Sequence, residues 1–243
     1  MSRDSLSIKS RPTNFRDIKG QDDVVADILD LAREGSFPAF SIFHGPSGSG
    51  KTSSALALAR LLKCNDYNFS KKTICKKCEG CQSAEGANLF HVNCAVENIR
   101  DHFVGEIRQG YKFYSNPWSC AGPRVHLYEE IHCWSKMDHA KLLKLTEMKN
   151  VQNVFIFTTT VLEQIYKPLV SRFTPFSFRS VSLENAVQVL IGAANCAGLN
   201  ISEDDLWKIA EAHYPDLRSA VNLLPLFELR RRRQPDIPVR NLL

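Results

Sequence analysis

The chain has 243 residues, of which 44% are hydrophobic and 23% charged, and a formal net charge of +5 at pH 7. This length and composition predict a globular protein with one large domain, or a large and a small one. No stretch approaches the roughly 18 apolar residues of a membrane span, and the polar start of the chain is unlike a secretory signal. We therefore expect a cytoplasmic protein without membrane contact, whose eight cysteines are thiols or metal ligands.

The predicted elements of the first part of the chain alternate between helices and short apolar strands. A polar arm over 1–20 is expected to be extended. Helical spacing of apolar residues predicts helices over 21–34, 51–63, 98–113 and 135–148. Short apolar runs predict strands over 37–43, 87–94, 124–129 and 153–160. Such alternation predicts an α/β domain with a parallel sheet between two layers of helices.

The pattern changes after Phe178, where no further strand is predicted. Ser182 and Ser202 precede helical patterns and are expected to be N-caps, and a third helix is predicted over 217–229. The expected organisation is an α/β domain at 1–179, a small all-helical domain at 180–229 and a basic, proline-containing tail at 230–243.

The segment GPSGSGKT lies between a predicted strand and a predicted helix, and it fits the phosphate-binding pattern G-x-x-x-x-G-K-[ST]. Its glycines let backbone N–H groups surround phosphate oxygens, and the helix N-terminus adds partial positive charge. Lys51 is expected to contact the β and γ phosphates of a nucleotide, and the Thr52 hydroxyl to bind Mg²⁺. The expected nucleotide-binding residues here are Gly45, Pro46, Ser47, Gly48, Ser49, Gly50, Lys51, Thr52 and Ser53.

Two adjacent carboxylates, Glu129 and Glu130, end the apolar run VHLYE. In phosphate-loop folds, a strand next to the loop ends in an acid that holds Mg²⁺, and the next acid orients the attacking water. We therefore expect Glu129 to bind magnesium and Glu130 to be catalytic, with a solvated pair of loop carboxylates as the alternative. The usual metal-binding residue is aspartate. Because a misplacement of about 1 Å can cost ~10²-fold in rate, the longer Glu129 is expected to slow hydrolysis.

Four cysteines follow the predicted phosphate-loop helix with the spacing C-x10-C-x2-C-x2-C: Cys64, Cys75, Cys78 and Cys81. Their flanking residues are too polar for a core, and four thiolates at this spacing suit tetrahedral Zn²⁺. A C-x2-C-x2-C run also occurs in iron–sulfur proteins, which leaves an iron–sulfur cluster as the alternative. We expect a structural zinc-binding insertion at 64–82. His91 and Cys94, in a predicted apolar strand, are expected to be core residues rather than ligands.

The order of these motifs resembles that of the ATPase subunits of DNA polymerase clamp loaders, closest to the bacterial gamma/tau type within the AAA+ superfamily. The resemblance begins at RPTNFRDIKGQ, where the family has an arm of the form RP-x-x-F-x-D-hydrophobic-x-GQ, and continues to DLRSAVNLL. It covers nearly the whole chain, including the cysteine-rich insertion. It implies an AAA+ domain with a helical lid that uses ATP and Mg²⁺ to load a sliding clamp onto primer–template DNA in replication. It also implies assembly with other clamp-loader subunits, as a homo- or hetero-oligomer that is expected to be a pentamer.

The resemblance also implies roles for single residues. Those expected to contact the adenine are Arg11, Pro12 and Ile18. Thr159, at the end of the fourth predicted strand, matches a residue that senses the γ-phosphate, with Thr158 and Thr160 as alternatives within the alignment. Arg172, in VSRF, matches an arginine that acts in the ATP site of a neighbouring subunit. Arg218, in PDLRSA, matches one that reaches from the lid to the nucleotide.

The chain departs from the family pattern at several points. Glu129 stands where the family has aspartate, Phe173 follows Arg172 where the family has cysteine, and MKNVQN replaces a proline-containing turn. The chain ends soon after the expected lid, so the family's C-terminal collar domain is expected to be missing from it. Two alternatives remain. One is a non-hydrolysing structural subunit of a clamp loader, a class that typically lacks an intact phosphate loop. The other is a different AAA+ ATPase acting on nucleic acid, against which the cysteine-rich insertion counts.

Overall fold

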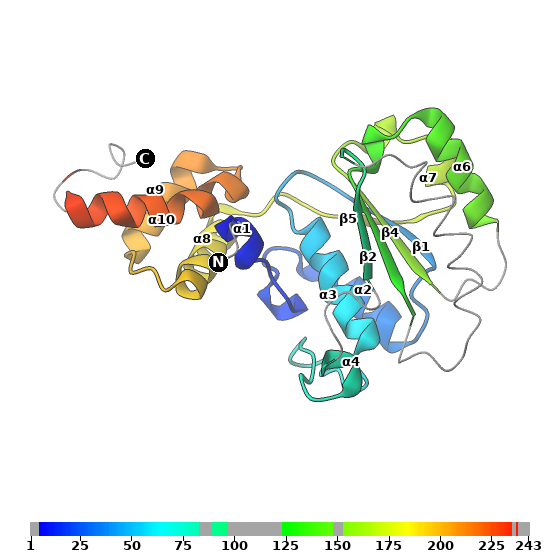
Figure 1. The fold of residues 1–243 in the computed structure, drawn as a ribbon, viewed down its shortest axis with the longest axis horizontal. Helices are drawn as coiled ribbons and strands as arrows, with labels where there is room; N and C mark the ends of the chain where they lie inside the picture. Colours follow the sequence, from blue (N-terminus) through cyan, green and yellow to red (C-terminus); the bar gives the residue numbers. More distant parts are fainter. Residues whose placement is uncertain (1–4, 83–88, 97–122, 148–152, 235–236, 238–243) are drawn as a thin grey trace.

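A five-stranded parallel sheet organises the larger part of the molecule (Figure 1). The computed structural model describes residues 5–82, 89–96, 123–147, 153–234 and 237; the helix expected at 98–113 lies outside them. The strands are β1 (Phe40–His44), β2 (Leu89–Asn93), β3 (Val125–Glu129), β4 (Val154–Thr159) and β5 (Thr174–Ser177). Their order across the sheet is β2-β3-β4-β1-β5, and all neighbouring strands run parallel.

Helices cover both faces of this sheet, because its strands are apolar on both sides. On one face pack α2 (Asp22–Arg33) and α3 (Lys51–Lys63), and on the other α6 (Lys136–Thr146) and α7 (Lys167–Val170). Alternation along β4 divides its side chains between the two cores: Ile156 belongs to the first, Phe155 and Phe157 to the second. The predicted α/β arrangement is confirmed.

The C-terminal part is helical, as expected. It consists of α8 (Leu183–Ala197), α9 (Glu203–His213) and α10 (Leu217–Arg233), which share a separate buried core. Ser182 and Ser202 accept hydrogen bonds from the backbone N–H groups of Asn185 and Asp205, so both predicted N-caps are confirmed.

The third helix of this part, α10, ends at Arg233 rather than at 229, and its last turn is held by one contact to α9 and one within α10. Arg231 Nη2 lies 2.7 Å from Asp205 Oδ1, and Arg232 Nη2 lies 2.7 Å from Glu228 Oε1. Both carboxylates are largely buried, which makes these contacts part of the packing of the helical part.

The N-terminal arm is not extended throughout, contrary to the prediction. It forms a short helix, α1 (Leu6–Lys9), and a 3-10 turn at Phe15–Asp17. Leu6 packs against the helical C-terminal core, whereas Phe15 and Ile18 are buried in the α/β core beside α2 and α3. The arm therefore joins the two parts of the molecule, and burial of its few apolar residues overrides its polar composition.

Two further expectations from the sequence were wrong. The sheet has a fifth strand, β5, at its edge beside β1. Its short sequence contains Pro175, which an edge strand tolerates, and only Phe176 is buried, so the apolar pattern was weak. His91 on β2 is exposed rather than in the core, while Cys94 is buried as expected.

The sheet brings the predicted chemistry-bearing segments to one edge. The glycine-rich loop follows β1, Glu129 ends β3 and Thr159 ends β4. Because these strands are parallel neighbours, their carboxyl ends open into a common crevice, the usual ligand position in open α/β sheets. Within the described residues, no helix has the length and apolar character needed to cross a membrane.

Candidate active site

The loop after β1 has a backbone conformation that requires glycine. Gly45, Gly48 and Gly50 have φ angles of 145°, 74° and 94°. A Cβ at Gly45 would lie 2.1 Å from the carbonyl oxygen of Phe178, so the loop also approaches a second segment too closely for a side chain. Gly50 is the N-cap of α3. The unpaired N–H groups at a helix N-terminus thus face the crevice, an arrangement that fits phosphate groups.

Lys51 is the first residue of α3 and only 6% exposed. Its Nζ donates hydrogen bonds to the carbonyl oxygens of Gly45 (2.8 Å) and Pro46 (2.7 Å). Burial lowers the pKa of Lys51, the carboxylate of Glu130 opposes that shift, and the positive charge of Arg218 adds to it. The ammonium group is therefore held in a confined site together with charges of both signs.

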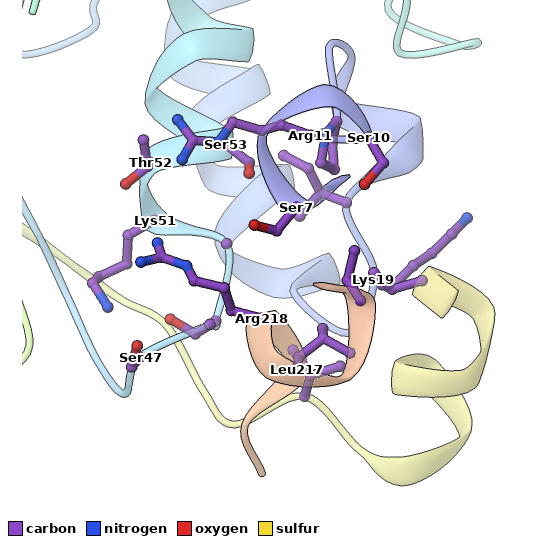
Figure 2. A pocket seen from close by; sticks show the side chains of 18 of the residues that line it. Ser7, Ser10, Arg11, Lys19, Ser47, Lys51, Thr52, Ser53, Leu217 and Arg218 are labelled. Atoms are coloured by element: carbon purple, nitrogen blue, oxygen red, sulfur yellow. The ribbon is translucent and has the colours of Figure 1, made fainter. Parts of the chain in front are cut away.

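Two arginines from distant segments join Lys51. Figure 2 shows Arg11 on the N-terminal arm and Arg218 extending from the start of α10 toward the first turn of α3. Burial lowers the pKa of Arg11; Glu129 opposes the shift and Arg218 adds to it. Holding three mutually repelling cations partly away from water costs free energy. An anion with several charges between them would offset that cost.

The crevice is lined by most of the residues predicted for it. Those are Arg11, Pro12, Ile18, Ser47, Gly48, Ser49, Gly50, Lys51, Thr52, Ser53, Glu130 and Arg218. Gly45 and Pro46 do not line the crevice, but their carbonyl oxygens accept hydrogen bonds from Lys51. Sequence reasoning missed further lining residues from the arm and the helical part: Ser7, Ser10, Asp17, Lys19, Val181, Val189, Leu217 and Val221. Asp17 and Lys19 lie within the arm motif and Leu217 lies beside Arg218, but the motifs did not single them out. The others carry no local motif and come here through the packing of the arm and the helical part.

The carboxylate of Glu129 is largely buried, and its two oxygens have different surroundings. Its Oε2 lies 3.4 Å from Nε2 of His91, whereas Oε1 is buried with no hydrogen-bond partner among the described residues. Burial acts to raise the pKa of Glu129, but interactions with His91, Thr52 and Arg11 outweigh it and lower the pKa below its usual range. An ionised carboxylate with one buried, unpartnered oxygen beside Thr52 fits a Mg²⁺ ligand.

Glu130 lines the crevice from a strained position. Its φ and ψ of 56° and 45° are left-handed, which is uncommon for a residue other than glycine and concentrates at functional sites. Its N–H donates to Oγ1 of Thr158 (3.4 Å), and its Oε2 lies 3.5 Å from Nδ1 of His132. Neighbouring groups on β4 and after β3 thus fix both the backbone and the side chain of Glu130.

Thr158 and Thr159 are both buried, but on opposite faces of β4. Thr158 shares its face with Ile156, on the side of α3. Thr159 faces the α6 side, where its Oγ1 lies 3.0 Å from Nδ1 of His132 and accepts the N–H of Val161 (3.1 Å). Thr159 therefore does not line the crevice and reaches Glu130 only through His132.

Arg172 lies outside the crevice. Its Nη2 lies 3.1 Å from Oε1 of Glu147, and its Nη1 donates to Oγ1 of Thr146 (3.3 Å) at the end of α6. The guanidinium is about one third exposed on this surface. Unlike Arg218, Arg172 is thus presented outward, away from the chain's own crevice.

The four cysteines of the expected insertion lie together beyond the other end of α3. Their sulfur atoms all lie within 4.8 Å of one another, with Sγ of Cys75 and Cys81 3.9 Å apart. Four thiolates bound to one zinc at about 2.3 Å would be about 3.8 Å apart, so the set fits a single tetrahedral ion. The backbone N–H groups of Cys75 and Cys78 point at Sγ of Cys64 and Cys75 (both 3.4 Å), as expected around thiolate ligands.

Comparison with known proteins agrees with this geometry. Over 229 residues the chain is 29% identical to DNA polymerase III subunit gamma/tau of Mycoplasma pneumoniae, with 91% of this chain and 32% of that protein covered. It is 26% identical over 213 residues to replication factor C subunit 4 of Caenorhabditis elegans, with 88% and 59% covered. The chain spans about a third of the length of the relatives from Mycoplasma and Bacillus subtilis.

The fold and the family are also recognised. The RuvB Holliday junction branch migration motor of Thermotoga maritima superposes with a TM-score of 0.67 at 18% identity, over 96% of this chain and 71% of that one, which confirms the AAA+ fold. The model of the family described as DNA polymerase III, delta subunit, matches residues 20–182, more than half of the chain. The expected resemblance is thereby confirmed: the chain belongs to the DNA polymerase III delta subunit family and is an AAA+ protein of the clamp-loader type.

Proposed function

We propose that this protein is an ATP-hydrolysing motor subunit of a sliding-clamp loader that acts in DNA replication in the cytoplasm. The observation that carries the proposal is the convergence of Arg11, Lys51 and Arg218 on a glycine-rich loop at a helix N-terminus. A nucleoside triphosphate supplies the several negative charges that such a cluster requires. The AAA+ fold and the clamp-loader relatives support ATP as that nucleotide.

In this proposal different residues bind the phosphates, bind the metal and activate the water. Lys51 contacts the β and γ phosphates, and Arg218 reaches the nucleotide from α10. Thr52 and Glu129 hold the Mg²⁺ that accompanies ATP, which when bound neutralises charge on the phosphate oxygens. Glu130, in the wall of the crevice, orients the attacking water.

The remaining assigned residues act at the margins of the site. Arg11, Pro12 and Ile18 surround the adenine from the N-terminal arm. Thr159 faces away from the crevice, so it would sense the γ-phosphate only indirectly, through His132, which contacts both Thr159 and Glu130. The outward position of Arg172 supports a role in the ATP site of a neighbouring subunit.

The proposed organisation follows the clamp-loader type. Residues 1–179 form the ATPase domain with a zinc-binding insertion at 64–82, and the residues from 180 onward form the lid. The lid includes α10 up to Arg233, so the basic tail proposed at 230–243 begins only after that helix. The proposed assembly is a pentamer with other clamp-loader subunits that binds a sliding clamp and primer–template DNA. The names of the relatives in DNA polymerase III and replication factor C support this setting.

ATP turnover in the assembled complex, with and without a cognate clamp and primed DNA, tests the proposal. We expect turnover stimulated by clamp and DNA and abolished by Lys51→Ala. ATP binding without any turnover in the complex would instead identify a non-hydrolysing structural subunit, an outcome that the extra methylene of Glu129 favours. Stimulation by branched DNA in the absence of a clamp would identify a different nucleic-acid motor of the AAA+ class.

A further inference from the structure

The departure at position 129, glutamate where clamp loaders have aspartate, has a matching feature on the neighbouring strand. β2 and β3 pair in parallel, with His91 opposite Leu127 and Asn93 opposite Glu129. Side chains alternate along a strand, so His91, Leu127 and Glu129 share the face of the sheet that carries α3. The imidazole of His91 is therefore a diagonal neighbour of the Glu129 carboxylate.

The contact between these two side chains involves only one of the two carboxylate oxygens. Nε2 of His91 lies 3.4 Å from Oε2 of Glu129. The other oxygen, Oε1, is buried and has no hydrogen-bond partner in the part of the chain that the structure describes. The side chain of His91 is itself about one third exposed, so it lies outside the core.

The length of the glutamate decides whether this contact forms. An aspartate carboxylate would be shorter by one carbon–carbon bond, about 1.5 Å, and would leave the imidazole beyond hydrogen-bond reach. Glutamate also has one more rotatable bond than aspartate, which must be fixed before its carboxylate can serve as a ligand of defined position. A partner that fixes one oxygen removes that freedom.

We propose that His91 is a positioning residue for Glu129: its Nε2–H holds Oε2, and this directs Oε1 toward the magnesium ion beside Thr52. The inference rests on the proposed ATPase function, since it assigns a role within the same metal site. His91 touches neither nucleotide nor metal. It acts through Glu129, as hydrogen-bond partners of metal-binding carboxylates generally do.

The test compares two substitutions in the full chain that differ in hydrogen-bonding capacity. His91→Leu removes the donor, whereas His91→Gln keeps an N–H donor on a side chain of similar reach. Mn²⁺ binding in the presence of ATP is followed by the electron paramagnetic resonance signal of free Mn²⁺, a readout independent of turnover. Loss of such a partner typically weakens metal binding ~10-fold or more, so we expect that loss for His91→Leu and less than about threefold for His91→Gln.

Binding of a fluorescent ATP analogue without metal controls for folding and is expected to be equal in all variants. A second step uses Glu129→Asp, whose shorter carboxylate loses the contact. In that background His91→Leu should change Mn²⁺ affinity by less than about twofold, since the two side chains no longer interact.

Three results would overturn the inference: unchanged Mn²⁺ affinity in His91→Leu, equal losses in His91→Leu and His91→Gln, or a full His91→Leu effect in the Glu129→Asp background. Failure of the wild-type chain to bind the ATP analogue at all is a different result. It would overturn the proposed function, and the inference with it.

Discussion

The two ends of α3 carry two sites that are built in opposite ways. At its N-terminus, after Gly50, charged groups arrive from the arm, from β3 and from α10, so the site is assembled from segments far apart in the sequence. At its C-terminus, Cys64 caps the helix and the other three cysteines follow within the next turns of chain. One site depends on the tertiary fold and the other on a short stretch of sequence.

The two ends of α3 also differ in the kind of ligand that they suit. At the N-terminal end like charges face one another, and a buried oxygen of Glu129 has no hydrogen-bond partner among the described residues, which suits a ligand that binds and leaves. At the C-terminal end four sulfur atoms lie within 4.8 Å of one another, which suits a permanently held ion. One helix can therefore support both an exchangeable site and a structural site when binding at one end does not affect the other.

Removal of the metal is expected to have the largest effect, confined to the C-terminal end. Structural zinc contributes about 10 kcal/mol or more to the folding of zinc-finger peptides, and the insertion at 64–82 has little other core. Extraction with a strong chelator should release one zinc per chain and make the insertion sensitive to limited proteolysis. Affinity for a fluorescent ATP analogue should change by less than about threefold if the ends are independent. Iron and a visible chromophore in the purified protein would contradict the zinc assignment.

The next largest effect is expected from Lys51→Ala at the N-terminal end. Hydrogen bonds to charged groups contribute about 1.5–3 kcal/mol each, so we expect the affinity for the ATP analogue to fall ~100-fold or more. The zinc content, measured by elemental analysis, should be unchanged and serves as the control for folding. Full ATP affinity in this variant would remove the assignment of the glycine-rich loop as the phosphate site.

How far the sequence predicts each site follows from this contrast. The glycine-rich loop, the carboxylate pair and the four cysteines are local patterns. The loop and Glu130 line the crevice and the four sulfur atoms lie together, whereas Glu129 is not among the residues that line the crevice. Arg11 and Arg218, more than 200 residues apart in the chain, were expected only through the family resemblance. Their place in the crevice depends on how the arm and α10 pack, which no local pattern encodes.

The errors have the same physical origin. α1 forms because Leu6 is partly buried by the helical C-terminal part, although the arm is polar overall. β5 forms because the edge of β1 offers it backbone partners, despite Pro175. His91 was assigned to the core from its apolar strand, yet among the described strands β2 lies at the other edge of the sheet, where the polar side chain of His91 is partly exposed and lies close to Glu129.

Gly80→Ala probes the C-terminal end of α3 with a smaller perturbation that leaves every ligand in place. A Cβ at Gly80 would lie 1.9 Å from the carbonyl oxygen of Lys63, in the last turn of α3. Backbone cannot move aside as a flexible side chain can, so the short helix α4 (Glu79–Gln82) must shift and carry Cys81 with it. We expect a destabilisation of about 1–3 kcal/mol, measured as faster transfer of zinc to a chromophoric chelator and a lower midpoint of unfolding.

Gly192→Ala in α8 is the matched control for Gly80→Ala, since the added Cβ would meet no described atom within 4 Å apart from its chain neighbours and the backbone of its own helix. Alanine is favoured over glycine in a helix by about 0.5–1 kcal/mol, so this variant should be slightly more stable and release zinc at the wild-type rate. Both variants should keep wild-type affinity for the ATP analogue. If Gly80→Ala weakens nucleotide binding as much as it speeds zinc release, then α3 transmits the strain along its length, and the two ends work as one coupled unit.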